Sequence, residues 1–431
     1  MTKFLTIEEA MKKGKGKVIV RGWARRERKS NAFIFIILRD HTEDIQCVIE
    51  KENVSEDVWK TAEKVTVESS LVIEGDIIKD KRAKSGYEIH VKKLEIVHLA
   101  ERFPIARDLS TEFLLDVRHL WLRSRKLATI FKVRDTVLWS IRDFFHKHGY
   151  YEWTPPIFTP TACEGGATLF EVKYFDEKAY LTQSWQLYAE TGIFGLEKIF
   201  TISPCFRAER SKTSRHLTEF LMAEVETAWQ TFPEMLTQAE ELISYVVQQV
   251  VKKHEKDLKE LGQDVAKLKK VKAPFPKITY TEALKILKDK EKMDIPWGKD
   301  LRTIEEDKLM KHFDKPIIVT HYPKEIMAFY KPADPKDPKT AVCMDMLLPE
   351  GYGEVMGGSK RDEDIKAMKK ALKDSGQKPK DYEWYFDTRR YGSVPHCGFG
   401  VGVERLIAWI CKLEHIRDAM PFPRTMVRKS P

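Results

Sequence analysis

The sequence predicts an α+β protein with a small N-terminal β-barrel and a larger domain of mixed helices and strands. The chain has 431 residues, which is too many for one ordinary hydrophobic core. Short apolar or alternating segments follow one another closely between residues 17 and 98. Beyond residue 125, long segments with apolar residues at helical spacing alternate with strand-like segments. These three observations predict two or more domains of different architecture.

The N-terminal segments have the pattern of five short strands separated by turn-forming residues. Their ranges are 17–27, 32–40, 44–50, 70–78 and 87–97. Strands this short and closely spaced favour a small barrel of the OB type, which binds oligonucleotides on one face. A β-sandwich without a ligand is the alternative interpretation.

The order of segments predicts three parts. Residues 1–100 form the predicted barrel domain, residues 101–127 a connecting segment, and residues 128–431 the larger domain. We find no internal repeat and no extended low-complexity segment.

Several segments of the larger domain have a clear local pattern. Residues 125–149 have apolar residues at helical spacing and end at a glycine, and residues 232–262 predict the clearest helix. The basic, proline-containing stretch 265–277 predicts a connector, and 362–376 predicts an exposed helix.

Composition and charge argue against several classes of protein. The 75 basic and 66 acidic residues leave a net charge of +9, which is compatible with a polyanionic partner but also typical of a lysine-rich solvated surface. The six cysteines form no CxxC pair and lack histidines at zinc-finger spacing, so we expect no disulfide framework, no structural zinc and a cytoplasmic location. The N-terminus lacks the apolar core of a signal peptide, and no uncharged run approaches the ~20 residues of a membrane span. We therefore expect no membrane association.

The stretch FTISPCFRAERSKTSRHLTEFLMAEVETAW concentrates charges between two apolar, β-prone segments. Arg207 follows the first segment, and Arg215 and His216 precede the second, so a hairpin would gather these cations over one sheet face. Arginine suits phosphate oxygens because its guanidinium is planar and stays charged. Phe220 offers an aromatic face for a base, and Glu209 can orient an arginine or accept a hydrogen bond from an exocyclic amine. A surface hairpin held by salt bridges is the alternative interpretation.

Two further stretches carry an unusual pattern. CGFGVGVERLIAWI puts three alternate glycines before Glu404 and Arg405, and alternate glycines let a strand approach a ligand or another backbone closely. This is not a dinucleotide-binding fingerprint, because the third glycine comes too early, and no GxxxxGK[ST] loop occurs in the chain. FHKHGYYEWTPPIF predicts a helix, a glycine and a strand that ends at Pro155.

In this order the three stretches resemble the three signature motifs of class II aminoacyl-tRNA synthetases. The helix and strand ending at Pro155 resemble the first motif, FRAER…RHLTEF the second and GVGVER the third. The predicted barrel is similar to the anticodon-binding OB domain of the class IIb branch, which contains the aspartate, asparagine and lysine enzymes. The resemblance covers essentially the whole chain. It implies an antiparallel catalytic sheet flanked by helices, and a homodimer whose interface includes the first motif.

The resemblance also implies how ATP is bound. In this family the substrate carboxylate attacks the α-phosphate of ATP, so the enzyme positions the reactants and stabilises charge. Arg207 and Arg405 would act in catalysis, Arg207 on the α-phosphate and Arg405 on the γ-phosphate. The other residues implied in ATP binding are Phe220 stacked on adenine, Glu209 near it, Arg215 and His216 at the outer phosphates, and Glu354.

A magnesium ion is implied at Asp345 and Glu354 in MDMLLPEGYGEV. Hard carboxylate oxygens shared with phosphate oxygens suit Mg²⁺. Aspartate enzymes often carry a serine where this chain has Gly357, so the set of ligands differs there. Two surface carboxylates are the alternative interpretation.

The amino-acid site is also assigned from the resemblance. Glu164 lies in a loop that resembles the mobile loop over the amino acid, and it would bind the α-ammonium, while Gln186 would help to hold the substrate. Where aspartate enzymes carry a lysine for the substrate carboxylate, this chain has Ala189. Without that cation a buried carboxylate is unfavourable.

Two further residues favour asparagine. Glu224 can accept a hydrogen bond from an amide NH₂ but would repel a carboxylate, and Arg361 can donate to the amide oxygen. The glycine-rich stretch PEGYGEVMGGSKR is also similar to asparaginyl-tRNA synthetases. The implied function is activation of L-asparagine with ATP and its transfer to the 3′ end of tRNA(Asn).

Three alternatives stay open. An aspartyl-tRNA synthetase, also one that charges both tRNAs, is disfavoured by Ala189 and Glu224. A related enzyme that makes free asparagine would not need the barrel. A non-catalytic RNA-binding protein would not need Arg207, Glu354 and Arg405.

Three barrel residues are implied in anticodon binding. Phe35 would stack on an anticodon base, Gln46 would bind the edge of the central uridine, and Arg25 would contact the first anticodon position or a phosphate. Phe33 and Phe35 share one face, so Phe35 as a core residue is the alternative interpretation.

Overall fold

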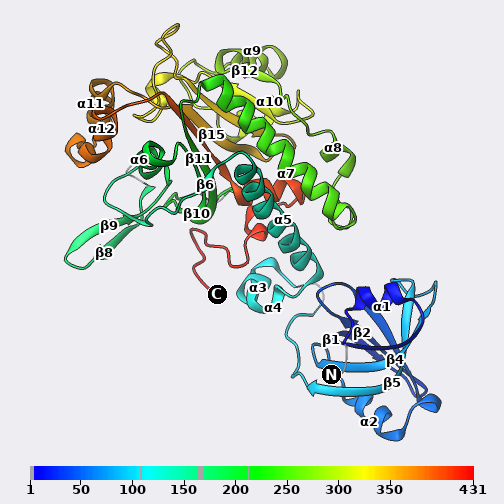
Figure 1. Ribbon diagram of the computed structural model, residues 1–431. Coiled ribbons are helices and arrows are strands. Elements are labelled where there is room, and N and C mark those ends of the chain that lie inside the picture. Colours follow the sequence, from blue (N-terminus) through cyan, green and yellow to red (C-terminus); the bar gives the residue numbers. More distant parts are fainter. Residues whose placement is uncertain (1–3, 107–108, 164–167, 212) are drawn as a thin grey trace. The chain divides into compact units, whose positions relative to one another are not determined.

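The computed structural model describes residues 4–106, 109–163, 168–211 and 213–431. The chain separates into two compact units, Met1–Thr111 and Glu112–Pro431. Figure 1 colours the first unit blue to cyan and the second unit cyan to red. Within the described ranges, no helix has the length and apolar character needed to span a membrane.

The first unit is a closed five-stranded barrel, as the sequence predicts for an OB fold. The strands are neighbours in the order β1-β2-β3-β5-β4. Their bounds are Gly16–Lys29 (β1), Phe33–Arg39 (β2), Asp44–Glu50 (β3), Ser70–Lys79 (β4) and Tyr87–His98 (β5). Alternation on β2 buries Ile34, Ile36 and Leu38 inside the barrel and leaves Phe33 and Phe35 on its outer face. The barrel interpretation is therefore confirmed over the sandwich.

Two helices of the first unit were not predicted. They are α1 (Ile7–Lys13) and α2 (Glu56–Lys64), with a 3₁₀ turn η1 (Lys51–Asn53) between them. Thr6 and Ser55 cap their N-termini, each by accepting a hydrogen bond from a backbone N–H of the first turn. Each helix buries only two residues, so its apolar signal in the sequence is weak.

The second unit is built on an eight-stranded sheet in the order β12-β13-β14-β15-β16-β11-β10-β6. Neighbouring strands are antiparallel except at the two edges, where β12 pairs with β13 and β6 with β10 in parallel. The bounds are Lys277–Thr279 (β12), Ile317–Thr320 (β13), Cys343–Leu348 (β14), Gly353–Lys360 (β15), His396–Gly402 (β16), Glu219–Ala228 (β11), Lys198–Phe206 (β10) and Tyr151–Glu152 (β6). A separate small sheet has the order β7-β9-β8, with bounds Phe158–Thr159, Glu177–Leu181 and Glu171–Tyr174.

Helices flank the large sheet, and α5, α7 and α13 share its main hydrophobic core (Figure 1). The α-helices are α3 (Thr111–Asp116), α4 (Arg118–Trp121), α5 (Arg125–Lys147), α6 (Gln186–Leu196), α7 (Phe232–Glu260), α8 (Val265–Lys269), α9 (Tyr280–Glu291), α10 (Thr303–Met310), α11 (Ile365–Asp374), α12 (Glu383–Arg390) and α13 (Val403–Ile410). The described residues of this unit also form the 3₁₀ turns η3 (Lys324–Ile326), η4 (Pro379–Tyr382) and η5 (Ile416–Ala419). Alternation on β11 sends Ala223 and Val225 into that core and Glu224 and Glu226 to the opposite face.

Two local expectations need correction. The expected connector at 265–277 begins with the short helix α8, because Asp264 caps it and Val265 and Leu268 are buried. The expected exposed helix at 362–376 is α11, and it is anchored by fully buried Met368 and Leu372.

Candidate active site

A cavity of about 930 Å³ lies on the face of the large sheet that carries Glu224 and Glu226. Its lining includes every residue predicted to bind ATP, metal or amino acid in the described part of the second unit. These residues are Gln186, Arg207, Glu209, Arg215, His216, Phe220, Glu224, Asp345, Glu354, Arg361 and Arg405. Glu164, the other predicted residue, lies outside the described residues.

The hairpin predicted for the charged stretch, residues 200–229, is present. Strand β10 ends at Phe206 and β11 begins at Glu219, and the Arg207 backbone N–H donates to the Thr218 carbonyl over 3.0 Å. The Arg207 guanidinium lies 5.6 Å from the centre of the Phe220 ring. The hairpin therefore presents a guanidinium next to an aromatic ring, and these two groups suit a phosphate and a base.

The loop between the two strands brings Glu209, Arg215 and His216 to the same cavity. His216 Nε2 lies 3.4 Å from a Glu209 carboxylate oxygen, and burial lowers the pKa of His216, so the ring is neutral near pH 7. Arg215 donates to Glu306 over 3.3 Å and to Asp307. These two acids of α10 were not predicted, because no local pattern links a helix to an arginine 91 residues away.

The glycines of β16 make room for side chains of the neighbouring strand. A Cβ at Gly398 would lie 2.1 Å from a Glu226 oxygen and 2.5 Å from Arg361 Nη2. A Cβ at Gly400 would lie 2.7 Å from the Met222 methyl carbon. Gly398 and Gly400 are therefore needed for close packing of side chains under the cavity.

Arg405 of the GVGVER stretch contacts both the charged FRAER…RHLTEF stretch and strand β15. It stands in the first turn of α13, and its Nη1 donates to the Glu354 carbonyl and lies 4.0 Å from the Glu354 carboxylate. Its Nη2 donates to the Arg215 carbonyl over 3.4 Å. The guanidinium is thus placed between the charged loop and the carboxylates of β14 and β15.

Asp345 and Glu354 converge on Gly357. A Cβ at Gly357 would lie 3.2 Å from Glu354 Oε1 and 3.4 Å from Asp345 Oδ1, so the missing side chain leaves space between the two carboxylates. Burial raises the pKa of Asp345, and the neighbouring Glu354 charge raises it further. Two crowded carboxylates beside an open space fit a hard divalent cation.

Two further acids lie near Asp345 and Glu354. One is Glu306, which also binds Arg215, and the other is Asp300, which was not predicted either. Burial and the Glu354 charge raise the pKa of Glu306 to about 7, and burial and Glu354 also raise that of Asp300. Their positions on α10 and before it gave no sequence pattern that would link them to β14 and β15.

At the other end of the cavity, Glu224 and Arg361 each have a protein partner. Glu224 accepts hydrogen bonds from the Ser184 hydroxyl and from the Trp185 backbone N–H over 3.0 Å. Arg361 binds Glu226 through two bonds, Nε to Oε1 over 3.0 Å and Nη2 to Oε2 over 2.8 Å. The Arg361 guanidinium also lies 5.4 Å from the centre of the Tyr330 ring. The predicted donor and acceptor therefore line one cavity, and each is held in place by a separate contact.

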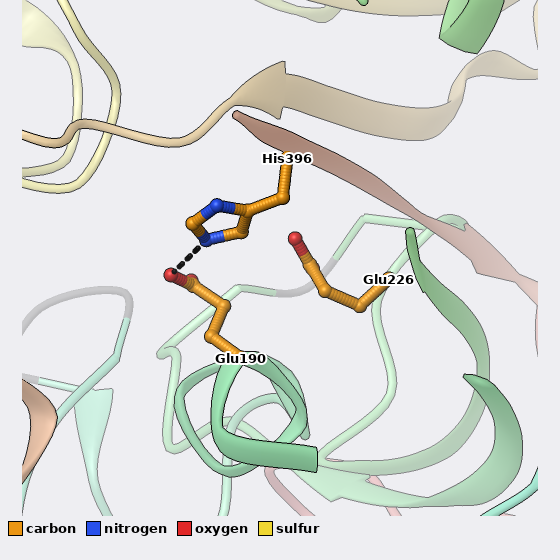
Figure 2. Close-up of side chains that lie close together, drawn as sticks. All are labelled: Glu190, Glu226 and His396. Atoms are coloured by element: carbon orange, nitrogen blue, oxygen red, sulfur yellow. Dashed lines mark hydrogen bonds and ion pairs between the residues drawn. The ribbon is translucent and has the colours of Figure 1, made fainter. Parts of the chain in front are cut away.

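Glu226 and Glu190 are the main residues missed at this end. Glu226 has a signal in the sequence, because it follows Glu224 by two residues on a strand and so shares its face. Glu190 accepts a hydrogen bond from Gln186 Nε2 over 2.9 Å. Figure 2 shows Glu190, Glu226 and His396 pointing toward one another from α6, β11 and the start of β16.

The barrel carries the predicted anticodon residues on its outer surface. Phe35 stacks against Phe33 with ring centres 6.1 Å apart. Gln46 Nε2 donates to Glu88 over 3.1 Å, and Arg25 pairs with Asp44. Trp23 is 46% exposed and was not predicted. The outer face of the barrel thus combines aromatic rings with polar and basic groups.

Comparison with known proteins agrees with this architecture. Residues 110–426 match the model for tRNA synthetases class II (D, K and N), and residues 18–97 match that for an OB-fold nucleic acid binding domain. The asparagine–tRNA ligase of Thermococcus kodakarensis is 48% identical over 96% of this chain and 96% of its own length. That of Symbiobacterium thermophilum is 43% identical over 100% of both chains.

Solved structures give the same result. The asparaginyl-tRNA synthetase of Pyrococcus horikoshii complexed with asparaginyl-adenylate superposes with a TM-score of 0.96, at 45% identity over 100% of both chains. The Entamoeba histolytica asparaginyl-tRNA synthetase complexed with asparaginyl-adenylate has a TM-score of 0.88, at 31% identity over 96% of this chain and 97% of that one. The chain therefore belongs to the class II aminoacyl-tRNA synthetases of the aspartate, lysine and asparagine group.

Proposed function

We propose that this protein is an asparaginyl-tRNA synthetase, which activates L-asparagine with ATP and transfers it to the 3′ end of tRNA(Asn). The observation that carries the proposal is the amino-acid end of the cavity, where Arg361 is already neutralised by Glu226 and Glu224 stands close by. Such a site fits a neutral carboxamide, because a carboxylate would meet an acid and a guanidinium that is already paired. The names of the relatives support the same substrate.

The reaction begins with the carboxylate of asparagine. One of its oxygens forms a bond to the α-phosphorus of ATP, the bond from that phosphorus to the bridging oxygen breaks, and pyrophosphate leaves. Arg207 holds the α-phosphate and stabilises the added negative charge, while Phe220 stacks on the adenine with Glu209 near it. Arg405, Arg215 and His216 hold the outer phosphates. In the second step a hydroxyl of the tRNA 3′ end attacks the acyl carbon, and AMP leaves.

Two groups, Arg361 and Glu224, recognise the side chain of asparagine. Bonds to Glu226 and Ser359 use three of the five N–H groups of Arg361, and one of the others donates to the carboxamide oxygen. Glu224 accepts a hydrogen bond from the carboxamide nitrogen. Gln186 contacts the backbone part of the substrate, and we assign Glu164 to its α-ammonium group by resemblance alone.

Asp345 and Glu354 would hold a magnesium ion that enters with ATP. When bound, the ion offsets the negative charge of the phosphates. The carboxylates of β14 and β15 would provide oxygen ligands, and Arg405 Nη1 lies 4.0 Å from the Glu354 carboxylate.

Replacing Glu354 with glutamine should raise the Mg²⁺ concentration for half-maximal activity by at least about 10-fold. The substitution removes one negative charge and keeps the size of the side chain. The measurement is asparagine-dependent ATP–pyrophosphate exchange over a magnesium titration. Glu350→Gln is the matched control, because Glu350 lies in the turn between β14 and β15, pairs with Lys267 and does not line the cavity. An unchanged magnesium requirement in Glu354→Gln would contradict the assignment.

The substrate is tested by ATP–pyrophosphate exchange with asparagine and aspartate supplied separately. We expect exchange with asparagine and little with aspartate. Exchange with aspartate alone would overturn the proposal.

We further propose that the outer face of the barrel binds the anticodon. Phe35 stacks on one base, Gln46 binds a base edge, and Arg25 contacts a base or phosphate. The stacked Phe33 and Phe35 rings and the exposed Trp23 support this role.

Replacing Phe35 with alanine should weaken tRNA binding by about 1–3 kcal/mol, which corresponds to a roughly 5- to 150-fold rise in Kd. ATP–pyrophosphate exchange should not change, because it needs no tRNA in this scheme. Filter binding with tRNA(Asn) measures the first effect. Val97→Ala is the control, since Val97 is 63% exposed at the end of β5 and is not part of the proposed face. Equal Kd values for Phe35→Ala and the wild type would contradict the role of Phe35.

We also propose a cytoplasmic homodimer. All six cysteines are buried and the sequence has no CxxC pair, which suits a reducing compartment. The first motif exposes Trp139 on α5 and Tyr151 on β6, and large exposed aromatic residues favour a protein contact. Light scattering that gives the mass of one chain would contradict the dimer.

A further inference from the structure

A buried cluster of five charged or titratable side chains lies at the amino-acid end of the cavity. Its members, which we call the charge cluster, are Glu190, Glu226, Arg361, Arg389 and His396, and none is more than 7% exposed. Arg361 and Glu226 line the cavity, and the other three lie behind it. Charges at this depth interact strongly, because little water screens them.

Glu190 is fully buried and accepts several hydrogen bonds at once. Its Oε2 accepts from the Tyr385 hydroxyl over 2.7 Å, from Arg389, and from His396 Nε2 over 3.1 Å. Burial alone would raise the pKa of Glu190, but Arg389 and His396 hold it below its ordinary value. Glu190 is therefore ionised.

His396 joins the charge cluster through both ring nitrogens. Its Nδ1 lies 2.7 Å from the Val394 carbonyl oxygen and its Nε2 lies 3.1 Å from Glu190. The charge cluster thus brings two guanidinium groups and an imidazole against two carboxyl groups.

The three residues drawn in Figure 2 have ligand atoms within 4.8 Å of one another, a spacing that a metal ion would accept. Both carboxylates are already bound by guanidinium groups, Glu190 by Arg389 and Glu226 by Arg361. A cation would have to compete with these ion pairs. The cluster is therefore a salt-bridge network and not a metal site.

Glu190 also contacts two residues that line the cavity. Its Oε1 accepts from Gln186 Nε2 over 2.9 Å and lies 3.8 Å from Arg361 Nε. Because the Gln186 amide nitrogen is engaged in this way, the Gln186 oxygen is kept as an acceptor for the cavity. Glu190 thus orients one cavity residue and offsets the charge of another without lining the cavity itself.

We propose that Glu190 is a positioning residue that sets the preference for asparagine over aspartate, by offsetting positive charge beside Arg361 and by orienting Gln186. This inference rests on the proposed function. With the Glu190 charge removed, the guanidinium groups of Arg361 and Arg389 would face the Glu226 carboxyl group alone. The cavity would then favour a substrate carboxylate more than it does in the wild type.

The test is Glu190→Gln, which removes the charge at nearly constant volume. In ATP–pyrophosphate exchange we expect the KM for asparagine to rise at least 10-fold while the KM for ATP stays within 2-fold. We also expect the ratio of kcat/KM for asparagine to that for aspartate to fall at least 10-fold. An unchanged ratio, or equal increases in both KM values as a general structural defect would give, would overturn the inference.

Two further variants separate charge from folding. Tyr385→Phe removes one hydrogen bond to Glu190 without changing any charge, and we expect the substrate ratio to stay within 3-fold of the wild type. His396→Asn removes one hydrogen-bond partner of Glu190, keeps the Glu190 carboxylate, and should not lower the preference for asparagine. This variant tests the charge argument even if Glu190→Gln does not fold. A collapse of the ratio in either variant would overturn the charge argument. Absence of exchange with asparagine in the wild type would overturn the proposed function and this inference together, whereas an active wild type with an unaltered Glu190→Gln ratio would overturn the inference alone.

Discussion

Replacing Arg207 with glutamine is expected to lower the kcat of asparagine-dependent ATP–pyrophosphate exchange by about 10²–10³-fold. Arg207 directly follows β10, and its guanidinium lies beside Phe220, where the α-phosphate of a stacked nucleotide would lie. Negative charge increases on that phosphate as the new bond forms, so a fixed cation stabilises the transition state more than the bound substrate. The fall should therefore appear in kcat and not only in KM.

Arg210→Gln is the matched control for this experiment. Arg210 lies three residues further along the same loop, is exposed, and is absent from the cavity lining. Its substitution should leave the exchange rate within about 3-fold of the wild type. If Arg207→Gln and Arg210→Gln had the same small effect, the role of Arg207 at the α-phosphate would be wrong.

Replacing Arg361 with methionine is expected to destabilise the second unit by about 3–5 kcal/mol. The guanidinium is 4% exposed and binds Glu226 through two hydrogen bonds. Without it, the Glu226 carboxylate would be buried beside the negative charge of Glu190. The cost of an uncompensated buried charge is much larger than the net benefit of the ion pair. Urea unfolding followed by tryptophan fluorescence measures the change.

The neighbouring residue provides the control. Lys360 pairs with Glu363 over 3.2 Å, and both side chains are 37% exposed. Lys360→Met should therefore change the stability by less than about 1 kcal/mol, as for other exposed ion pairs. Equal unfolding midpoints for Arg361→Met and Lys360→Met would contradict the assignment of a buried, structurally required guanidinium.

The strands of the barrel could be predicted closely because they follow a simple alternation. Predicted strand 44–50 coincides with β3, and predicted strand 87–97 is one residue shorter than β5. The short helices α1 and α2 could not be found in this way, since each buries only two side chains and depends on its capping residue. Local patterns thus identify the elements that bury side chains at regular intervals along one face.

The residues of the candidate site also fall into two groups, those within local motifs and those paired over long distances in the sequence. Arg207, Phe220 and Arg405 stand at recognisable places in local motifs, so they can be predicted as site residues from the sequence alone. The pairs Arg361–Glu226 and Arg389–Glu190 are separated by 135 and 199 residues, so only the folded sheet reveals them. The sequence therefore predicted some of the groups that line the cavity, whereas Glu226, Asp300 and the partners that hold these groups were found only in the structure.

Glu404 joins the three motif regions at a single buried point. Its carboxylate accepts from Arg134 of α5 over 2.7 Å and from the Leu221 backbone N–H of β11 over 2.8 Å, while Glu404 itself belongs to α13. Sliding of α5 along the sheet would have to break a carboxylate contact in the protein interior. The Leu221 amide proton should therefore exchange with deuterated solvent only when the whole unit opens. A displacement of α5 would also pull on the hairpin of β10 and β11, because Glu404 binds both.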